Sequence, residues 1–104
     1  MQDLEGKRFK VNAWGKRYEV FIYVDKYLDG KATVIRLIEL ANLEPFATLT
    51  CNIPGVKLEP DEVLIKRWSE NEQVANDALA TGWFEETGKI VPTGFAIAEI
   101  WRIK

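Results

Sequence analysis

Hydrophobic and polar residues alternate along much of the first half of the chain, and a period of two predicts β-strands. Over residues 8–14 one face carries Phe9, Val11 and Ala13, and the other is polar. Gly15-Lys16 fits a type II′ turn, which makes residues 17–24 the second strand of a hairpin. This second strand is apolar on both faces. We therefore expect it to be central in a sheet and covered on both sides.

Turn-forming residues divide the chain further. Residues 25–30 predict a turn, or one helical turn, that ends at Asp29-Gly30. Residues 31–40 suit a strand or a helix, and their β-branched content favours a strand. More strands are expected at 46–53, 62–68 and 95–103, with a turn at 42–45 and a loop at 54–60. Residues 83–86 and 90–91 flank an expected turn at 87–89, and a second turn is expected at 92–94.

One segment has helical periodicity. Ser69-Glu70-Asn71-Glu72 fits a capping box, in which the Ser69 hydroxyl accepts from the Glu72 amide and the Glu72 side chain reaches back. An apolar stripe follows, and Gly82 stands where a helix often ends. The stripe consists of Val74, Ala75, Ala78 and Leu79. The pattern predicts a helix at about residues 70–81.

The elements together predict an α+β fold in a single domain that spans residues 1–104. Short connections favour antiparallel neighbours. We expect a curved antiparallel sheet or half-barrel of about six to seven strands, with the one helix packed on it. The pattern does not give the strand order.

The amino-acid composition limits the catalytic and metal-binding chemistry that the chain can carry out. The chain has 104 residues, a net charge of −2, no histidine and one cysteine. A Ser-His-Asp or Cys-His arrangement, a zinc site of the common types and an internal disulfide are therefore excluded within it. No glycine-rich nucleotide motif occurs. We expect no cofactor, no metal and no catalytic residues. The start of the chain has no signal-peptide pattern and no stretch has the length of a membrane span, so a cytoplasmic, non-membrane protein is expected.

The remaining reactive groups have ordinary explanations. Cys51 shares a predicted strand face with Ala47, Leu49 and Ile53, which favours a core position over a nucleophile. Glu85 and Glu86 are adjacent and would face opposite sides of a strand. Glu59, Asp61 and Glu62 lack a calcium-loop pattern. A carboxylate-dependent enzyme stays open as an alternative, without positive support.

Charge is unevenly distributed. Residues 59–86 hold eight Asp or Glu against two Lys or Arg, a net charge of −6. If this segment folds to one side, it offers a negative surface to a basic protein partner. The candidate contacts are Glu70, Asn71, Glu72 and Asp77, of which Asn71 is the least explained by local structure. The alternative is a solvated helix face, since Glu70 and Glu72 also suit the helix dipole.

The first hairpin is basic. It carries Lys7, Arg8, Lys10, Lys16 and Arg17, interleaved with Phe9, Trp14 and Tyr18. Basic and aromatic residues on a sheet can bind single-stranded nucleic acid. Lysines also protect edge strands, and these aromatic residues stand at core spacing. Because the net charge is negative, nucleic acid is the weaker alternative.

Three stretches of the sequence are similar to motifs of a known family: residues 45–55, residues 68–72 and residues 86–95. The most specific parts are Ser69-Glu70-Asn71-Glu72 and the Thr-Gly-Lys-Ile-Val-Pro-Thr-Gly run at 87–94. In this order they resemble a family of small bacterial proteins known as domain of unknown function 4313, found mainly in gut bacteria and their mobile elements. The resemblance covers most of residues 17–104. It implies a compact α+β accessory domain and carries no catalytic residues.

The leading functional hypothesis is a non-enzymatic module that binds another protein through the acidic helix side. If the chain belongs to a phage or other mobile element, an inhibitor of a host defence protein is one form of this hypothesis. The partner's identity and the oligomeric state do not follow from the sequence.

Overall fold

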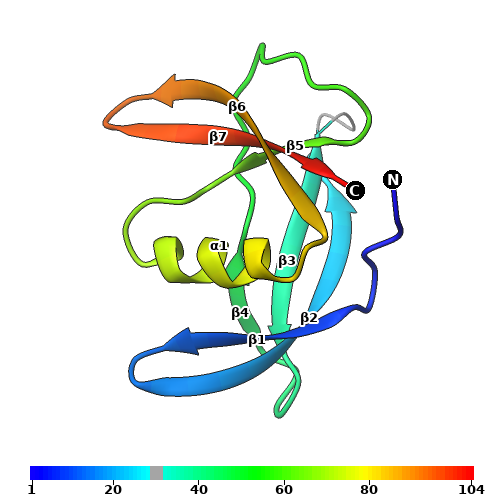
Figure 1. Cartoon of the computed structure of the whole chain (residues 1–104), viewed down its shortest axis with the longest axis vertical. Helices are drawn as coiled ribbons and strands as arrows, with labels where there is room; N and C mark the ends of the chain where they lie inside the picture. The colour runs from blue at the N-terminus through cyan, green and yellow to red at the C-terminus, as the bar shows by residue number, and fades with distance from the viewer. Residues whose placement is uncertain (29–31) are drawn as a thin grey trace.

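The computed structural model describes residues 1–28 and 32–104. Within these residues it contains seven strands and one helix (Figure 1): β1 (Arg8–Ala13), β2 (Lys16–Lys26), β3 (Thr33–Glu39), β4 (Pro45–Thr48), β5 (Glu62–Ile65), α1 (Asn71–Ala80), β6 (Phe84–Thr93) and β7 (Ala96–Ile103). The predicted α+β class is confirmed. The turn expected to end at Asp29-Gly30 lies outside the described residues.

The strands form two sheets. One has the order β1-β2-β3-β4 and the other β5-β7-β6, and all neighbours are antiparallel. The expectation of a single curved sheet of six to seven strands is therefore wrong. The chain leaves the first sheet after Thr48 and meets the second at an isolated bridge between Thr50 and Ile65. The predicted strands 46–53 and 62–68 are accordingly shorter, because the chain turns away from each ladder early.

The main core lies between the two sheets and the helix. Alternate strand residues point into it, as a period of two requires. Trp101 is its largest fully buried side chain, and α1 adds Val74, Ala75 and Ala78. The strands contribute Val11, Val20, Ile22, Ile35, Leu37, Val63, Ile65, Phe84, Trp101 and Ile103. The helix thus packs its apolar face on both sheets at once.

A second, smaller apolar cluster lies on the other face of the three-stranded sheet. Leu64, Ala98 and Ile100 form it, and the segment between β4 and β5 covers them, including Cys51 and Ile53. The predicted face of Ala47, Leu49, Cys51 and Ile53 is therefore divided, since Ala47 and Leu49 belong to the main core. Cys51 is half-buried, and burial raises the pKa of its thiol. The core interpretation of Cys51 is supported.

Strand β2 is central, as predicted, but it is not covered on both sides. Val20 and Ile22 are fully buried on the inner face. On the outer face Phe21 is half-buried and Tyr23 is exposed. The outer face of the four-stranded sheet is therefore a surface.

Two hairpin turns differ from prediction by about one residue. Ala13 pairs with Lys16, so Trp14 and Gly15 are the central residues, with φ of 49° and 72°. Positive φ at both positions is the type I′ pattern, which replaces the expected type II′ turn at Gly15-Lys16. Thr93 pairs with Ala96, which places the second tip at Gly94-Phe95. The expected turn over 87–89 is instead an irregularity within one continuous strand, β6.

The predicted helix is confirmed, but the capping box is wrong. The N-cap is Glu70, and no side chain caps the helix. Ser69 has φ of 59°, and its backbone oxygen, not its hydroxyl, accepts from the Glu72 amide. Gly82, with φ of 81°, follows the C-cap Thr81 as predicted. The left-handed turn at Ser69 therefore sets where the helix begins.

The first residues of the chain connect the two sheets. The Gln2 amide donates to the Lys104 carbonyl, and the Val24 amide donates to the Glu5 carboxylate. Between them, Leu4 is buried in the main core. Figure 1 shows the two ends of the chain close together beside these strands. No helix in the described ranges has the length and apolarity needed to cross a bilayer.

Candidate binding groove

A groove of about 740 Å³ opens between the tip of the β1–β2 hairpin and the first turn of α1. We call it the hairpin groove. It brings together residues that the sequence assigned to two competing hypotheses, since Lys16 and Arg17 line it along with Glu70 and Asn71. The other lining residues are Asn12, Ala13, Trp14, Gly15, Phe46, Ala47, Gln73 and Val74.

Two aromatic rings, Trp14 and Phe46, line the apolar part of the groove, and Tyr18 packs against both of them outside its lining. Trp14 lies 5.9 Å from Tyr18 and 6.0 Å from Phe46 between ring centroids, and Tyr18 lies 5.2 Å from Phe46. Trp14 is 72% exposed. The spacing of Trp14 in the sequence favours a core position, and that prediction is wrong. The turn places Trp14 beyond the end of the sheet, where its ring contacts Tyr18 and Phe46 and is otherwise exposed.

The backbone of Trp14 is also unusual. A non-glycine residue with positive φ costs of order 1–3 kcal/mol, and Asn or Gly would suit this turn position better. Trp14 has φ of 49° and gains little burial from its position. The ring contacts with Tyr18 and Phe46 offset part of this cost, and the exposed remainder of the Trp14 ring is open to contact with another molecule. An adjacent Trp-Gly pair at a hairpin tip is the signal in the sequence that could have identified this residue.

Charges of both signs flank these rings. Lys16 and Arg17 stand on the hairpin side and Glu70 on the helix side, and all three are exposed. Within residues 1–28 and 32–104 none of the three forms an ion pair, and Glu70 makes no capping bond. Their charges are therefore available to a ligand.

Asn71 has a structural role that the sequence did not reveal. Its side-chain amide donates to the backbone carbonyls of Thr48 at 2.8 Å and of Lys66 at 3.0 Å. It therefore fastens the start of α1 to the end of β4 and to the chain after β5. This explains Asn71 without a partner.

Asp77 is also engaged inside the molecule. Its carboxylate accepts from the backbone amide of Asn12 at 2.8 Å and from the Gln73 side chain at 3.0 Å. Glu72 is exposed, and neither Glu72 nor Asp77 lines the hairpin groove. Of the four predicted partner contacts, only Glu70 combines exposure with a place in the groove.

The basic residues of the first hairpin do not all stand at the groove. The Lys7 ammonium lies over the Trp83 ring at 5.4 Å from its centroid. Arg8 and Lys10 are exposed and far along β1 from the tip, and Lys10 stands directly opposite Glu19 on β2. Only Lys16 and Arg17 line the groove. A phosphate backbone would thus meet two nearby cations and the Glu70 carboxylate.

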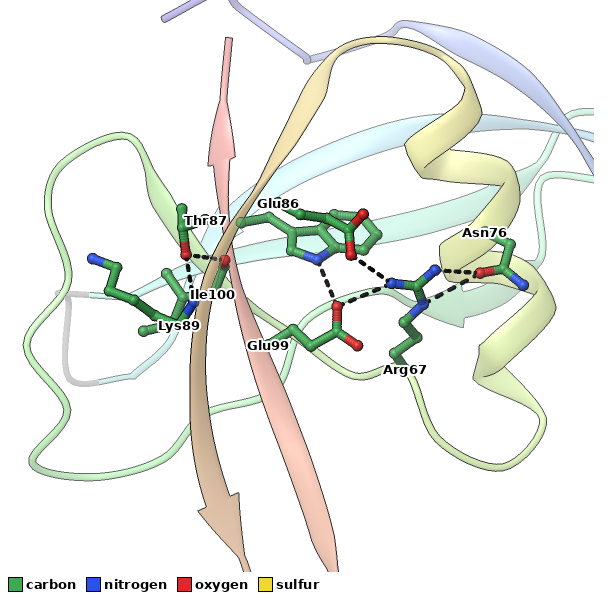
Figure 2. A network of polar contacts seen from close by, with 8 residues as sticks. Arg67, Asn76, Glu86, Thr87, Lys89, Glu99 and Ile100 are labelled. Atoms are coloured by element: carbon green, nitrogen blue, oxygen red, sulfur yellow. Dashed lines mark hydrogen bonds and ion pairs between the residues drawn. The ribbon is translucent and has the colours of Figure 1, made fainter.

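A polar network between α1 and the three-stranded sheet engages two other carboxylates (Figure 2). Arg67 donates to Glu86 and to Glu99, both at 3.0 Å, and to Asn76 of α1 at 2.6 and 3.2 Å. The Trp101 indole also donates to Glu99 at 3.0 Å. Burial opposes the Arg67 charge, but the bonds and charge of Glu99 and Glu86 raise its pKa overall. Both carboxylates are thus engaged by Arg67 within the fold.

Figure 2 also shows how the irregularity in β6 is held. The Thr87 hydroxyl donates to the Ile100 carbonyl at 2.6 Å and accepts from the Lys89 amide at 3.2 Å. Gly88 between them has φ of 82°. The Thr-Gly-Lys run thus has a local backbone role in this structure, and it keeps β6 paired with β7 on both sides of the irregularity.

Glu62 is a buried ion. Its side chain is 1% exposed and contacts the Lys89 ammonium, with Arg102 at 4.0 Å. The backbone amide of Glu59, then Lys89, lowers the pKa of Glu62. Asp61 pairs with Arg102 instead, as does Glu85. Across the part of the chain that the structure describes, no three His, Cys, Asp or Glu side chains are grouped to hold a metal ion.

Comparisons with protein-family models, curated proteins and solved structures gave no match. The resemblance to domain of unknown function 4313 stays a prediction from the sequence. The functional argument therefore depends on the site alone.

Proposed function

We propose that this chain is a non-enzymatic module that binds another protein through the hairpin groove. The observation that carries the proposal is Trp14, which is exposed at a hairpin tip with a backbone angle that other residues adopt more easily. Tryptophan is among the residues that most often dominate binding energy at protein interfaces. An aromatic centre with a charged rim is the ordinary layout of such an interface.

The charges favour a protein over a nucleic acid as the partner. Glu70 faces the same groove as Lys16 and Arg17, so a uniformly anionic ligand would meet repulsion on one side. A protein segment can supply both signs of charge. On the helix side, the exposed carboxylates of Glu70 and Glu72 favour a partner that is basic there.

The source of the partner follows from the resemblance. If the chain is an accessory domain of a phage or other mobile element, its partner is a host protein. Inhibition of a host defence protein is then the form of binding that we propose to test first.

Affinity capture tests the proposal, with the chain as bait in lysate of the cells that express it. Trp14→Ala and Glu70→Lys should each lose a partner that the unmodified chain retains. Phe95→Ala is the matched control, because Phe95 is also an exposed aromatic residue in a two-residue hairpin turn. Asp77 is left unchanged, since its loss would disturb the fold. A partner retained equally by all four baits would contradict the proposal, and so would a partner that nuclease treatment removes.

A further inference from the structure

We infer that the outer face of the four-stranded sheet binds single-stranded nucleic acid, with bases stacked on Phe21 and Tyr23 and phosphates beside Arg8 and Arg17. The inference goes beyond the proposed function, because it concerns a different surface from the hairpin groove. Of these four residues, only Arg17 also lines the groove.

Strand β2 presents two neighbouring aromatic side chains on this face. Val20 and Ile22 are fully buried in the main core, so the alternate residues Phe21 and Tyr23 point away from it. Phe21 is half-buried and Tyr23 is 46% exposed. Residues two apart in a strand lie roughly 7 Å from each other, and aromatic side chains on the open face of a four-stranded sheet can stack about two or three bases. The outer face thus offers two adjacent stacking positions.

The same face has a positive net charge. Residues that pair across an antiparallel ladder lie on one face of the sheet, and Arg8 stands directly opposite Phe21. Among the paired residues of β1, β2 and β3, the outer face carries Arg8, Lys10, Arg17 and Arg36 against Glu19 and Asp25. Its net charge is therefore +2, although the net charge of the whole chain is −2. Lys10 stands directly opposite Glu19, which leaves this carboxylate next to a cation.

Two of the cations have no carboxylate partner. Arg36 forms an ion pair with Asp25 at 2.9 Å, and this pair uses the second carboxylate of the face. Arg8 and Arg17 are exposed, and within residues 1–28 and 32–104 neither forms an ion pair. Two phosphates can therefore be neutralised here without breaking an internal contact.

The rings and the cations together favour a single strand over other anionic ligands. A single strand offers unpaired bases to the rings and phosphates to the arginines, and stacking on an aromatic side chain does not require a particular base. In a duplex the bases stack on one another, so Phe21 and Tyr23 would gain no stacking partner. An acidic peptide without aromatic residues would use the cations alone.

Fluorescence anisotropy tests the inference, with short labelled oligo(dT) and oligo(U) as probes at low salt. Saturable binding of either probe supports it. Affinity should fall by about 1.4 logarithmic units per tenfold rise in salt concentration, since two phosphates are neutralised. A duplex of the same length should bind about fivefold more weakly or less. No binding of either single strand would overturn the inference, as would equal binding of the duplex or of poly-glutamate.

An NMR titration of the unmodified chain locates the site without any substitution. The ring signals of Phe21 and Tyr23 should shift when oligo(dT) is added. The ring signals of Phe95, an exposed aromatic residue at a hairpin tip of the other sheet, should not shift. Shifts confined to Trp14 would place the strand in the hairpin groove and would overturn the inference.

Variants separate stacking from charge. Tyr23→Ala should weaken oligonucleotide binding about fivefold or more, and Tyr23→Phe, which keeps the ring, should not. Arg8→Glu should weaken binding more than Lys57→Glu, which makes the same change in net charge at an exposed position outside both sheets. Equal losses from the two charge changes, or no loss from Tyr23→Ala, would overturn the inference. A chain that binds no oligonucleotide but retains a Trp14-dependent protein partner would overturn this inference and leave the proposed function intact.

Discussion

The Asp77 carboxylate of α1 accepts a hydrogen bond of 2.8 Å from the backbone amide of Asn12 in the edge strand β1. Six residues earlier in the chain, Asn71 donates to the Thr48 carbonyl of β4, the opposite edge of the same sheet. One helix therefore satisfies backbone groups on both edges of the four-stranded sheet. The helix thus bridges the two edges of the open sheet, and the hairpin groove lies beside it.

We predict that Asp77→Ala lowers the free energy of unfolding by about 1–3 kcal/mol, because the Asn12 amide loses its acceptor. Urea denaturation measures this. Glu72→Ala on the same helix is the control, and it should change stability by no more than about 0.5 kcal/mol since Glu72 is exposed. Equal effects from the two substitutions would contradict a structural role for Asp77.

Asn71→Asp should also destabilise the fold by about 1–3 kcal/mol, because a carboxylate cannot donate to the Thr48 and Lys66 carbonyls. Thermal or urea unfolding measures the change. We expect any loss of partner binding to follow the loss of folded protein. A variant that folds with normal stability and no longer binds would show instead that Asn71 contacts the partner.

Leu4→Ala should lower the free energy of unfolding by about 2–5 kcal/mol, since it opens a cavity where the start of the chain meets both sheets. Met1→Ala is the control, because Met1 is exposed. Chemical denaturation of both variants measures the two free energies of unfolding. A cost for Leu4→Ala no larger than that of Met1→Ala would mean that the first residues are not part of the core.

Glu62 should make stability depend on pH in the acid range. Its pKa is lowered in the folded state, so it contributes stability that is present above its unfolded pKa, about 4.3, and is lost as the pH falls through the lower folded value. Unfolding free energies measured from pH 7 downward should fall less steeply for Glu62→Gln than for the unmodified chain. Parallel curves would show that the contact with Lys89 does not hold Glu62 as an ion.

Much of the fold could be predicted because alternation and turn residues are local signals. The helix, the first hairpin and the central position of β2 follow from them. The division into two sheets could not be predicted, because it depends on where the chain leaves one ladder after Thr48 and meets another at Ile65. The capping box failed for a similar reason, since Ser69 adopts a left-handed turn that the tertiary structure imposes.

The candidate site was predicted only in part. Charge patterning identified Glu70, Lys16 and Arg17. It assigned them to two separate surfaces, because residue 70 is far from residues 16 and 17 in the sequence. The roles of Asn71 and Asp77 depend on contacts with β4 and β1, which no local pattern encodes. Trp14 was assigned to the core by its spacing, and a shift of one residue in the turn moved it to the surface.

A photo-reactive phenylalanine analogue at position 14 gives the most direct test of the hairpin groove. The same analogue at position 95 is the control, at a second exposed hairpin tip. After irradiation in native lysate, we predict a covalent adduct with one protein from position 14 and none from position 95, and Glu70→Lys should reduce the yield. The same adducts from both positions, or none from position 14, would contradict the assignment of the groove as the binding site.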